Sequence, residues 1–479
     1  MNYKVIDNLD QMITKIEVEG LYEVFNHPIP LKEEAITLIL GENGLGKTLI
    51  LKMIKAFFDK DFYDLNTYHF GKFILHFKDK SIIIIEKEVN NEFSESLNFV
   101  YQIEGKKKTE KYSLSLSHFD NKNRRKGRDY YTHHSINLRH FHNDFNDDIE
   151  HRLVGFLPHY IERIGIDKWL DQRKGILLST RDVLNFYREY IPQDLFKDFE
   201  TKSGLPKWII EKTNSVKTKF IETQRLLTKI RAEESEYHSS VLKYSKELVE
   251  TIKNRTVAAT DLASRLDRSY PNRVIGEITK KTKITDIEIE EGLSNLNKRR
   301  ELLNKVGLLD TEEENLQPIT DAINKQQAKN KELLKDVLQI YLEDSNQKLE
   351  VYTDLASKLD LFIDLINKRF LYKKISIDKK TGFVFTSSIT NKNIPLSGLS
   401  SGEQHELVLF YQLLFNTEPN SLLLIDEPEI SLHISWQNHF IDDLRDVIKL
   451  TNFSAIIATH SPDIINNNWD LTVQLKGIN

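Results

Sequence analysis

Apolar positions along the chain first mark a set of buried strands. Continuous apolar runs at residues 35–40, 422–425 and 454–458 are typical of strands in a parallel sheet that is covered on both faces. Residues 49–58 carry apolar side chains at helical spacing, shortly after the first of these runs. We therefore expect an α/β protein in which a strand, a loop and a helix follow one another near the N-terminus.

Other stretches alternate apolar and polar positions, as antiparallel strands do. Residues 72–86, 99–103 and 112–116 alternate or are rich in β-branched side chains, which predicts strand pairs in an antiparallel subdomain. From residue 147 to about residue 212 the pattern becomes mostly helical, and residues 216–221 predict a further strand. We expect this helical insertion to accompany the antiparallel subdomain.

A long helical arm is predicted in the middle of the chain. Apolar residues from Val241 to Leu266 recur at steps of three and four, as in one stripe of a coiled coil. We expect Pro271 and Asn272 to interrupt this helix, and later helical stretches to bring the chain back at Phe370. The expected regions are an N-terminal lobe of residues 1–227, a helical hairpin of residues 228–372 and a C-terminal lobe of residues 373–479.

The amino-acid composition limits the classes of protein and the cellular compartments that fit this chain. The chain has no cysteine, which excludes disulfides and thiolate metal sites. No stretch approaches the ~20 apolar residues of a membrane span, and Asp7 and Asp10 lie where a signal peptide is apolar. The formal net charge of −5 restricts any nucleic-acid binding to a local patch. We therefore expect a soluble cytoplasmic protein without a membrane partner.

The segment Gly41-Glu-Asn-Gly-Leu-Gly-Lys-Thr48 has the full pattern of a phosphate-binding P-loop. Backbone N–H groups at a helix N-terminus bind triphosphate oxygens, a lysine adds positive charge, and a threonine hydroxyl binds Mg²⁺. The strand before it and the helix after it are the context that this loop needs. The expected ATP-binding residues are Gly41, Asn43, Gly44, Gly46, Lys47 and Thr48.

Four further polar residues lie at the end of a predicted strand or just after one. Asp426 ends an apolar run and is expected to complete the Mg²⁺ shell, while Glu427 beside it is a candidate for the base that positions the attacking water. His460 follows the run 454–458 and is a candidate for contact with the γ-phosphate. Gln224, just after the strand 216–221, is either a Mg²⁺-linked glutamine or an ordinary surface residue, and the sequence leaves both open.

A fourth motif lies at Leu399-Ser-Ser-Gly-Glu-Gln404. Ser400 reads as the N-cap of a helix, and Gly402 permits close backbone approach. The order of the four motifs resembles that of ATP-binding-cassette (ABC) ATPases. That resemblance implies ATP hydrolysis at sites shared between subunits, with Ser400 and Gly402 acting on the γ-phosphate held by another subunit. Ser401 stands where the commonest signature has glycine, and His433 stands where the D-loop usually has aspartate.

Longer sequence segments around these motifs indicate a particular branch of the ABC ATPases. They resemble the overcoming-lysogenization-like branch of ABC ATPases, and most of all the AriA-type ATPases of PARIS anti-phage systems, with the PtuA type of Septu systems as relatives. The resemblance implies a homo-oligomeric, ATP-dependent sensor that holds a separate TOPRIM-type effector nuclease until a phage trigger protein is met. The segments are residues 396–409, 425–433, Trp436-Gln437, 458–462 and Gly20-Leu-Tyr22.

Other interpretations stay open. A DNA-repair or chromosome ATPase would use the same head to clamp DNA, and a transporter subunit would use it beside a membrane partner. The basic run 123–128 is either a phosphate contact or a solvated loop. Fewer than about 20 residues follow His460, so we expect nuclease activity to reside in a separate protein. The histidines that invite a metal interpretation, without the spacing of a strong ligand set, are His133, His134, His140 and His142.

Overall fold

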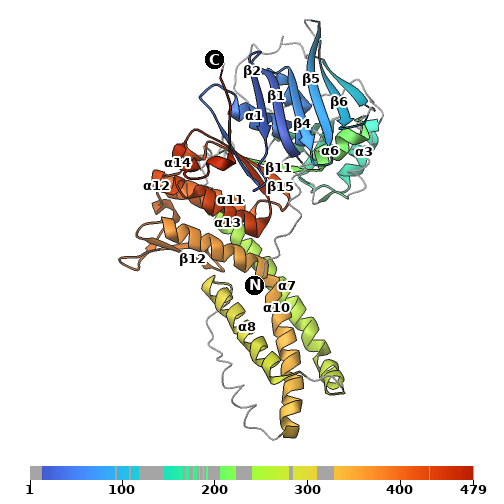
Figure 1. The fold of residues 1–479 in the computed structure, drawn as a ribbon. Helices are drawn as coiled ribbons and strands as arrows, with labels where there is room; N and C mark the ends of the chain where they lie inside the picture. Colours follow the sequence, from blue (N-terminus) through green and yellow to red (C-terminus); the bar gives the residue numbers. More distant parts are fainter. Residues whose placement is uncertain are drawn as a thin grey trace.

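The computed structural model describes most of the chain (Figure 1). Sheets and their covering helices form a head, and a helical arm extends away from it. The described residues are 13–91, 94–106, 109–117, 145–165, 168–171, 176–178, 180, 183, 187, 190–192, 205–222, 240–279, 284–309, 328–430 and 432–477.

A parallel sheet of five strands lies at the centre of the head, in the order β11-β15-β16-β3-β17. Its middle strands are almost wholly buried, which explains their continuous apolar runs. The register pairs Asp426 with Ala458 and Thr459 with Leu40, so the carboxyl ends of β15, β16 and β3 meet at one edge. The strands are β3 (Ile36–Leu40), β11 (Lys217–Glu222), β15 (Ser421–Asp426), β16 (Ser454–Thr459) and β17 (Thr472–Gln474).

An antiparallel sheet of six strands adjoins the parallel sheet, in the order β2-β1-β4-β5-β6-β7. The predicted strand pairs are present in it. Neither β1 nor β2 was predicted from the sequence pattern, and in β2 the residues Pro28 and Pro30 argue against a strand. Both prolines are accommodated because β2 is an edge strand. The strands are β1 (Ile13–Leu21), β2 (Phe25–Pro30), β4 (Lys72–Phe77), β5 (Ser81–Asn91), β6 (Ser94–Ile103) and β7 (Thr109–Ser117).

The stretch predicted to be mostly helical, residues 147–212, also contains a three-stranded antiparallel sheet, so that prediction was wrong in part. The strands have three to five residues, too few for a period to be recognised. They are held by a small core of their own around Trp169, whose indole N–H donates to Thr180 Oγ1 at 3.0 Å. The elements are α3 (Phe145–Val154), β8 (Ile161–Gly165), β9 (Lys168–Asp171), β10 (Ile176–Leu178) and α6 (Lys207–Asn214).

The described part of the arm consists of three helices, and the first of them runs through Pro271 without interruption, contrary to expectation. The proline removes the helical hydrogen bond that would reach the carbonyl of Asp267. Two residues later, Arg273 connects this part of the helix to its neighbour, because its guanidinium donates to Leu266 O at 3.0 Å and to Asp344 Oδ2 of α10 at 2.7 Å. The helices are α7 (Ser240–Thr279), α8 (Asp286–Lys305) and α10 (Ala328–Arg369).

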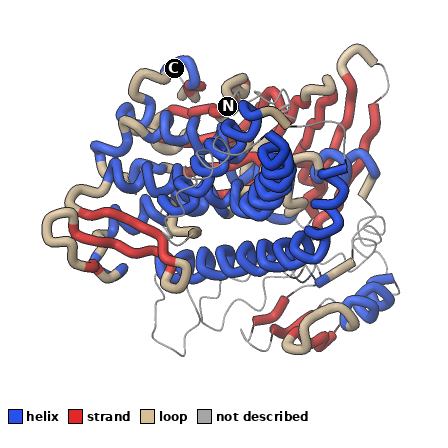
Figure 2. Tube along the Cα trace, turned by 90° about the horizontal axis from the view of Figure 1, so that it is seen from below, coloured by secondary structure: helices blue, strands red, loops and turns tan. Residues whose placement is uncertain are grey.

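After the arm, the chain forms a small sheet that projects from the helices, as Figure 2 shows from below. None of the described helices is both long enough and apolar enough to span a membrane. The strands of this sheet are β12 (Lys373–Asp378), β13 (Gly382–Ser387) and β14 (Asn393–Ile394). The shorter helical elements of the head are α2 (Phe62–Thr67), η3 (Leu396–Gly398), η4 (Pro428–Ile430), α12 (Ile434–Gln437), α14 (Pro462–Ile465) and η5 (Trp469–Leu471).

Alternate side chains of the parallel strands enter two separate cores. Leu422 and Leu424 of β15 pack in the core that contains α1, whereas Leu423 and Ile425 pack in the core that contains α11 and α13. This division follows from the two-residue period of a strand. The covering helices are α1 (Lys47–Phe58), α11 (Ser401–Phe415) and α13 (Phe440–Thr451).

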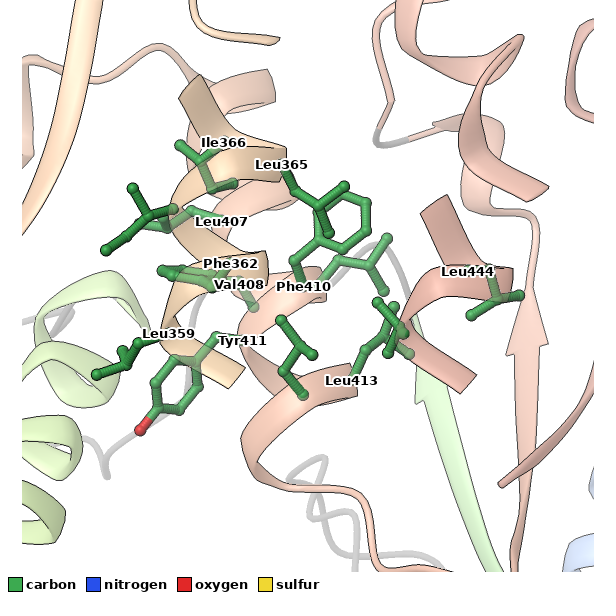
Figure 3. Packing of buried hydrophobic residues seen from close by; sticks show 14 of the residues in the cluster. Leu359, Phe362, Leu365, Ile366, Leu407, Val408, Phe410, Tyr411, Leu413 and Leu444 are labelled. Atoms are coloured by element: carbon green, nitrogen blue, oxygen red, sulfur yellow. The ribbon is translucent and has the colours of Figure 1, made fainter. Parts of the chain in front are cut away.

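The second core also takes in the end of the arm nearest the head. Figure 3 shows Leu365 and Ile366 of α10 close to Phe410 and Leu407 of α11, with Leu444 of α13 on the other side of α11. The predicted α/β class, with an antiparallel subdomain and a helical arm, is therefore confirmed.

Candidate nucleotide-binding site

The P-loop connects β3 to α1, and its glycines serve two different needs. Gly44 and Gly46 have φ values of +90° and +87°, which favour glycine. A Cβ on Gly46 would also lie 2.4 Å from Leu21 Cδ2, whereas a Cβ on Gly44 would meet nothing within 4 Å. No side chain of the described residues caps the first turn of α1. The start of α1 carries backbone N–H groups and the positive end of the helix dipole, which suit an anionic ligand.

Lys47 is almost fully buried at the start of α1. Its ammonium donates to Gly41 O at 2.9 Å and to Glu42 O at 3.1 Å, and lies 3.4 Å from His460 Nδ1. Burial lowers the pKa of Lys47, and the nearby carboxylates, of which Glu427 acts most strongly, oppose this shift. Lys47 therefore joins the P-loop to the segment that follows β16.

Thr48 and Asp426 are in direct contact across the edge of the sheet. The Thr48 hydroxyl donates to Asp426 Oδ1 at 3.0 Å. Burial raises the pKa of Asp426, the hydrogen bond from Thr48 opposes this, and the neighbouring Glu427 adds to the rise. Accumulated negative charge and hard oxygen atoms fit Mg²⁺. In the described parts of the chain, no group of three His, Cys, Asp or Glu side chains is placed to hold a metal ion.

Glu427 has an unusual backbone conformation, with φ at +46°. Its N–H donates to Ala458 O at 2.9 Å, which extends the contact between the ends of β15 and β16. The Glu427 carboxylate lies 3.6 Å from His460 Nε2, and both side chains are 31% exposed. The two groups therefore reach solvent side by side at the edge of the sheet.

Sequence reasoning missed Glu429, which fixes the position of His460. Its carboxylate accepts from the backbone N–H of His460 at 2.7 Å and from Thr459 Oγ1 at 2.8 Å. Its only sequence signal was an acidic residue two positions after Glu427. Glu429 therefore connects the turn after β15 to the end of β16.

Two residues of the β1–β2 hairpin also lie at the P-loop, although neither was predicted as a site residue. Tyr22, in the turn between β1 and β2, is 45% exposed, and its ring atom Cε2 lies 3.6 Å from the position that a Cβ on Gly46 would occupy. His27 is buried, and its Nε2 lies 3.0 Å from Leu45 O. Neither position follows from local periodicity, because both depend on the packing of β1 and β2 against the loop.

The second predicted loop is held by interactions of its own. Ser400 is the N-cap of α11, and its N–H donates to Glu403 Oε2 at 2.7 Å while its Oγ accepts from Glu403 N at 3.4 Å. Within the described residues, no hydrogen bond or ion pair joins Ser400 or Gly402 to the P-loop. The structure thus brings together Lys47, Thr48 and the residues after β15 and β16, and does not bring Ser400 or Gly402 to them.

Several predicted positions lie outside the described residues. They are Gln224, the basic run 123–128, and the histidines His133, His134, His140 and His142. His433, at the D-loop position, is instead the N-cap of α12, where its Nδ1 accepts from Ser435 N at 3.3 Å.

The family follows from a comparison with known proteins. The family described as "AAA ATPase domain" matches residues 12–465, which is nearly the whole chain. The chain belongs to this family. It is therefore an ATPase-family protein.

Curated relatives match shorter stretches. "Retron Ec83 probable ATPase" of Escherichia coli is 27% identical over 192 residues, which cover 39% of this chain and 31% of that protein. "Protein ea59" of Escherichia phage lambda is 42% identical over 69 residues, 14% of this chain and 13% of that protein. "Zinc import ATP-binding protein ZnuC" of Rickettsia prowazekii is 26% identical over 131 residues, 27% of this chain and 53% of that protein. The chain thus spans about half or less of the length of these relatives.

Among solved structures, the "SMC head domain from Thermotoga maritima" aligns with a TM-score of 0.32 and 12% identity, covering 98% of this chain and 95% of that chain. An SMC head domain from Pyrococcus furiosus, bound to the C-terminal domain of ScpA, aligns with a TM-score of 0.32 and 11% identity, covering 95% and 91%. Both likenesses are low in score and identity.

Proposed function

We propose that this chain binds ATP with Mg²⁺ and hydrolyses it. The observation that carries the proposal is the meeting of the P-loop, the Thr48–Asp426 contact and the Glu427–His460 pair at one edge of the parallel sheet. Groups that neutralise triphosphate charge and a group that orients water are the main requirements of phosphoryl transfer. Family membership supports the same conclusion.

Each residue has a role that its position suits. Lys47 and the loop N–H groups neutralise phosphate charge, and Thr48 and Asp426 would hold Mg²⁺. Gln224, which lies outside the described residues, is proposed from the sequence as a further ligand. Mg²⁺ would supply positive charge that offsets the charge of the triphosphate. Glu427 accepts a hydrogen bond from the attacking water and so orients it. His460, held through its backbone by Glu429, donates toward the terminal phosphate.

We propose that Ser400 and Gly402 complete the site of a second copy of this chain. Their lack of contact with the P-loop of their own chain supports this, as does the capped N-terminus of α11, whose positive end favours an anion. The active unit is then a homo-oligomer of at least two chains with composite ATP sites.

The biological role that we propose is that of a sensor in cytoplasmic anti-phage defence. In this role the oligomer holds a separate TOPRIM-type effector nuclease and responds to a phage trigger protein. The motif strings that resemble AriA-type ATPases support it, and the match to a retron ATPase agrees with it. The second candidate is a chromosome or repair ATPase that clamps DNA, which the shared head architecture favours.

The decisive test compares Lys47→Ala with Lys55→Ala, which changes a lysine of the same helix that pairs with Asp59 instead. We expect Lys47→Ala to lose ATP turnover by at least about 100-fold and Lys55→Ala to keep it. The purified protein with ATP and Mg²⁺ or Mn²⁺ should leave DNA and RNA intact, and toxicity in cells should require a partner gene. Unchanged turnover in Lys47→Ala would refute the ATPase assignment, and a strongly DNA-stimulated rate would favour the clamp.

A further inference from the structure

A buried cluster of three charged side chains joins the arm to α11. Arg369 is the last residue of α10, Glu406 lies in α11 and Asp443 lies in α13. Their exposed fractions are 8%, 1% and 9%. An NH₂ group of Arg369 donates to Asp443 Oδ2, so one side of the guanidinium is satisfied. Charges this deeply buried are normally paired. The contacts on the other side of the guanidinium therefore need to be identified as well.

The contact between Arg369 and Glu406 is only half formed. Arg369 Nε lies 3.9 Å from Glu406 Oε1, and among the described residues neither Arg369 Nε nor Glu406 Oε2 has a hydrogen-bond partner. A hydrogen bond between Arg369 Nε and Glu406 Oε1 needs about 2.7–3.2 Å. A displacement of α11 against α10 by about 1 Å would bring these two atoms to that distance and satisfy Arg369 Nε. The contact is open in the structure, and the arrangement with this hydrogen bond is called closed below.

The end of α10 also contacts the beginning of α11 directly. Lys373, shortly after α10, forms an ion pair with Glu403 Oε2 at 2.7 Å, and Glu403 belongs to the capping box of α11. The ring of Phe370 stacks on that of Trp436 at 6.0 Å and 17°, and Trp436 borders Gly402. A movement of α11 at Glu406 would therefore reach the loop that contains Gly402, which lies less than two helical turns away.

We propose that Arg369 and Glu406 are positioning residues whose hydrogen bond, made or broken with the proton on Glu406, sets the placement of Ser400 and Gly402. The proposal rests on the proposed function, because the loop that it positions is the one that completes a second copy's ATP site. Because Arg369 is the last residue of α10, a movement of the arm would then change the rate of ATP hydrolysis.

The charges around Glu406 explain why its proton matters. Burial raises the pKa of Glu406 to about 8, Arg369 opposes this, and Glu403 adds to it. Asp443 faces the far side of the Arg369 guanidinium, and Lys373 of β12 pairs with Glu403. Below about pH 8 the neutral carboxyl attracts Arg369 only weakly, and we expect the open contact there. Above it, the carboxylate makes a charge-assisted hydrogen bond and α11 takes the closed position.

The test measures ATP turnover and Trp436 fluorescence between pH 7 and 9 in wild type, Glu406→Gln and the control Asp364→Asn. Asp364 lies on α10, as Arg369 does, and pairs with Lys305 of α8, so its loss leaves α11 untouched. We expect kcat of the wild type and of Asp364→Asn to rise at least about fivefold across this range with KM unchanged, and Glu406→Gln to show no such rise. The part of the emission that Trp436→Phe removes should change over the same pH range, and should not do so in Glu406→Gln.

A second variant tests the direction in which the pH of the transition moves. Asp443→Asn leaves Arg369 facing Glu406 alone, so the transition should move to lower pH. The proposal is overturned if wild type shows no transition, if Glu406→Gln keeps it, or if Glu406→Gln only lowers the melting temperature. A fluorescence transition without ATP turnover would refute the proposed function and leave the positioning pair standing.

Discussion

Glu427 occupies a strained backbone conformation at the end of β15, and such strain is retained mainly where the position of a side chain matters. Because Glu427→Gln keeps the shape and the phosphate-binding groups but loses the charge that orients water, we expect it to bind ATP and to lower turnover by about 100-fold or more. ATP-bound assemblies should also persist longer. Rapid-quench turnover and mass photometry with ATP measure these effects.

The matched control for this prediction is Glu418→Gln. Glu418 is exposed and pairs with Lys217 at the start of β11, far along the strand from the edge where the site lies. It should turn over ATP as wild type does. Full turnover by Glu427→Gln would remove Glu427 from the site, whatever the control shows.

At the scale of elements, the entry into α1 depends on the packing of β1 against the P-loop. Gly46→Ala places a Cβ 2.4 Å from Leu21 Cδ2 at a φ of +87°, so it combines a clash with backbone strain. Gly44→Ala has a φ of +90° but open space, so it carries strain alone. We expect losses of roughly 3 kcal/mol for Gly46→Ala and about 1 kcal/mol for Gly44→Ala. Urea unfolding gives both values, and equal losses would contradict the packing argument.

At the scale of the whole molecule, a shared ATP site predicts complementation between two inactive proteins. Ser400→Arg blocks the loop at the start of α11, and Lys47→Ala disables the P-loop. Mixed oligomers contain some interfaces in which one site has both an intact Lys47 and an intact Ser400, so mixing should restore part of the turnover. The measurement is turnover against mixing ratio, with native mass spectrometry to count hybrids. Hybrids that form and stay inactive would argue against a shared site.

Local patterns predicted much of the fold. Continuous apolar runs revealed β3, β15 and β16, and alternation revealed β4 to β7, because a strand's burial is recorded in its own side chains. The strands β8 to β10 are too short to show a period, and the prolines of β2 argue against a strand, so local patterns did not predict them. Pro271 was expected to interrupt a helix, but α7 runs through it, and close by Arg273 pairs with Asp344 of another helix, a contact that local sequence does not show.

The sequence by itself determined which residues have the chemistry for ATP and where the P-loop lies between a strand and a helix, since both depend on neighbours along the chain. The tertiary structure alone decided that Glu429 holds His460, that Tyr22 borders Gly46, and that Arg369 faces Glu406 across an unfilled gap. These contacts join residues that are distant in sequence. Their distances are set by how sheets and helices pack, which no local pattern specifies.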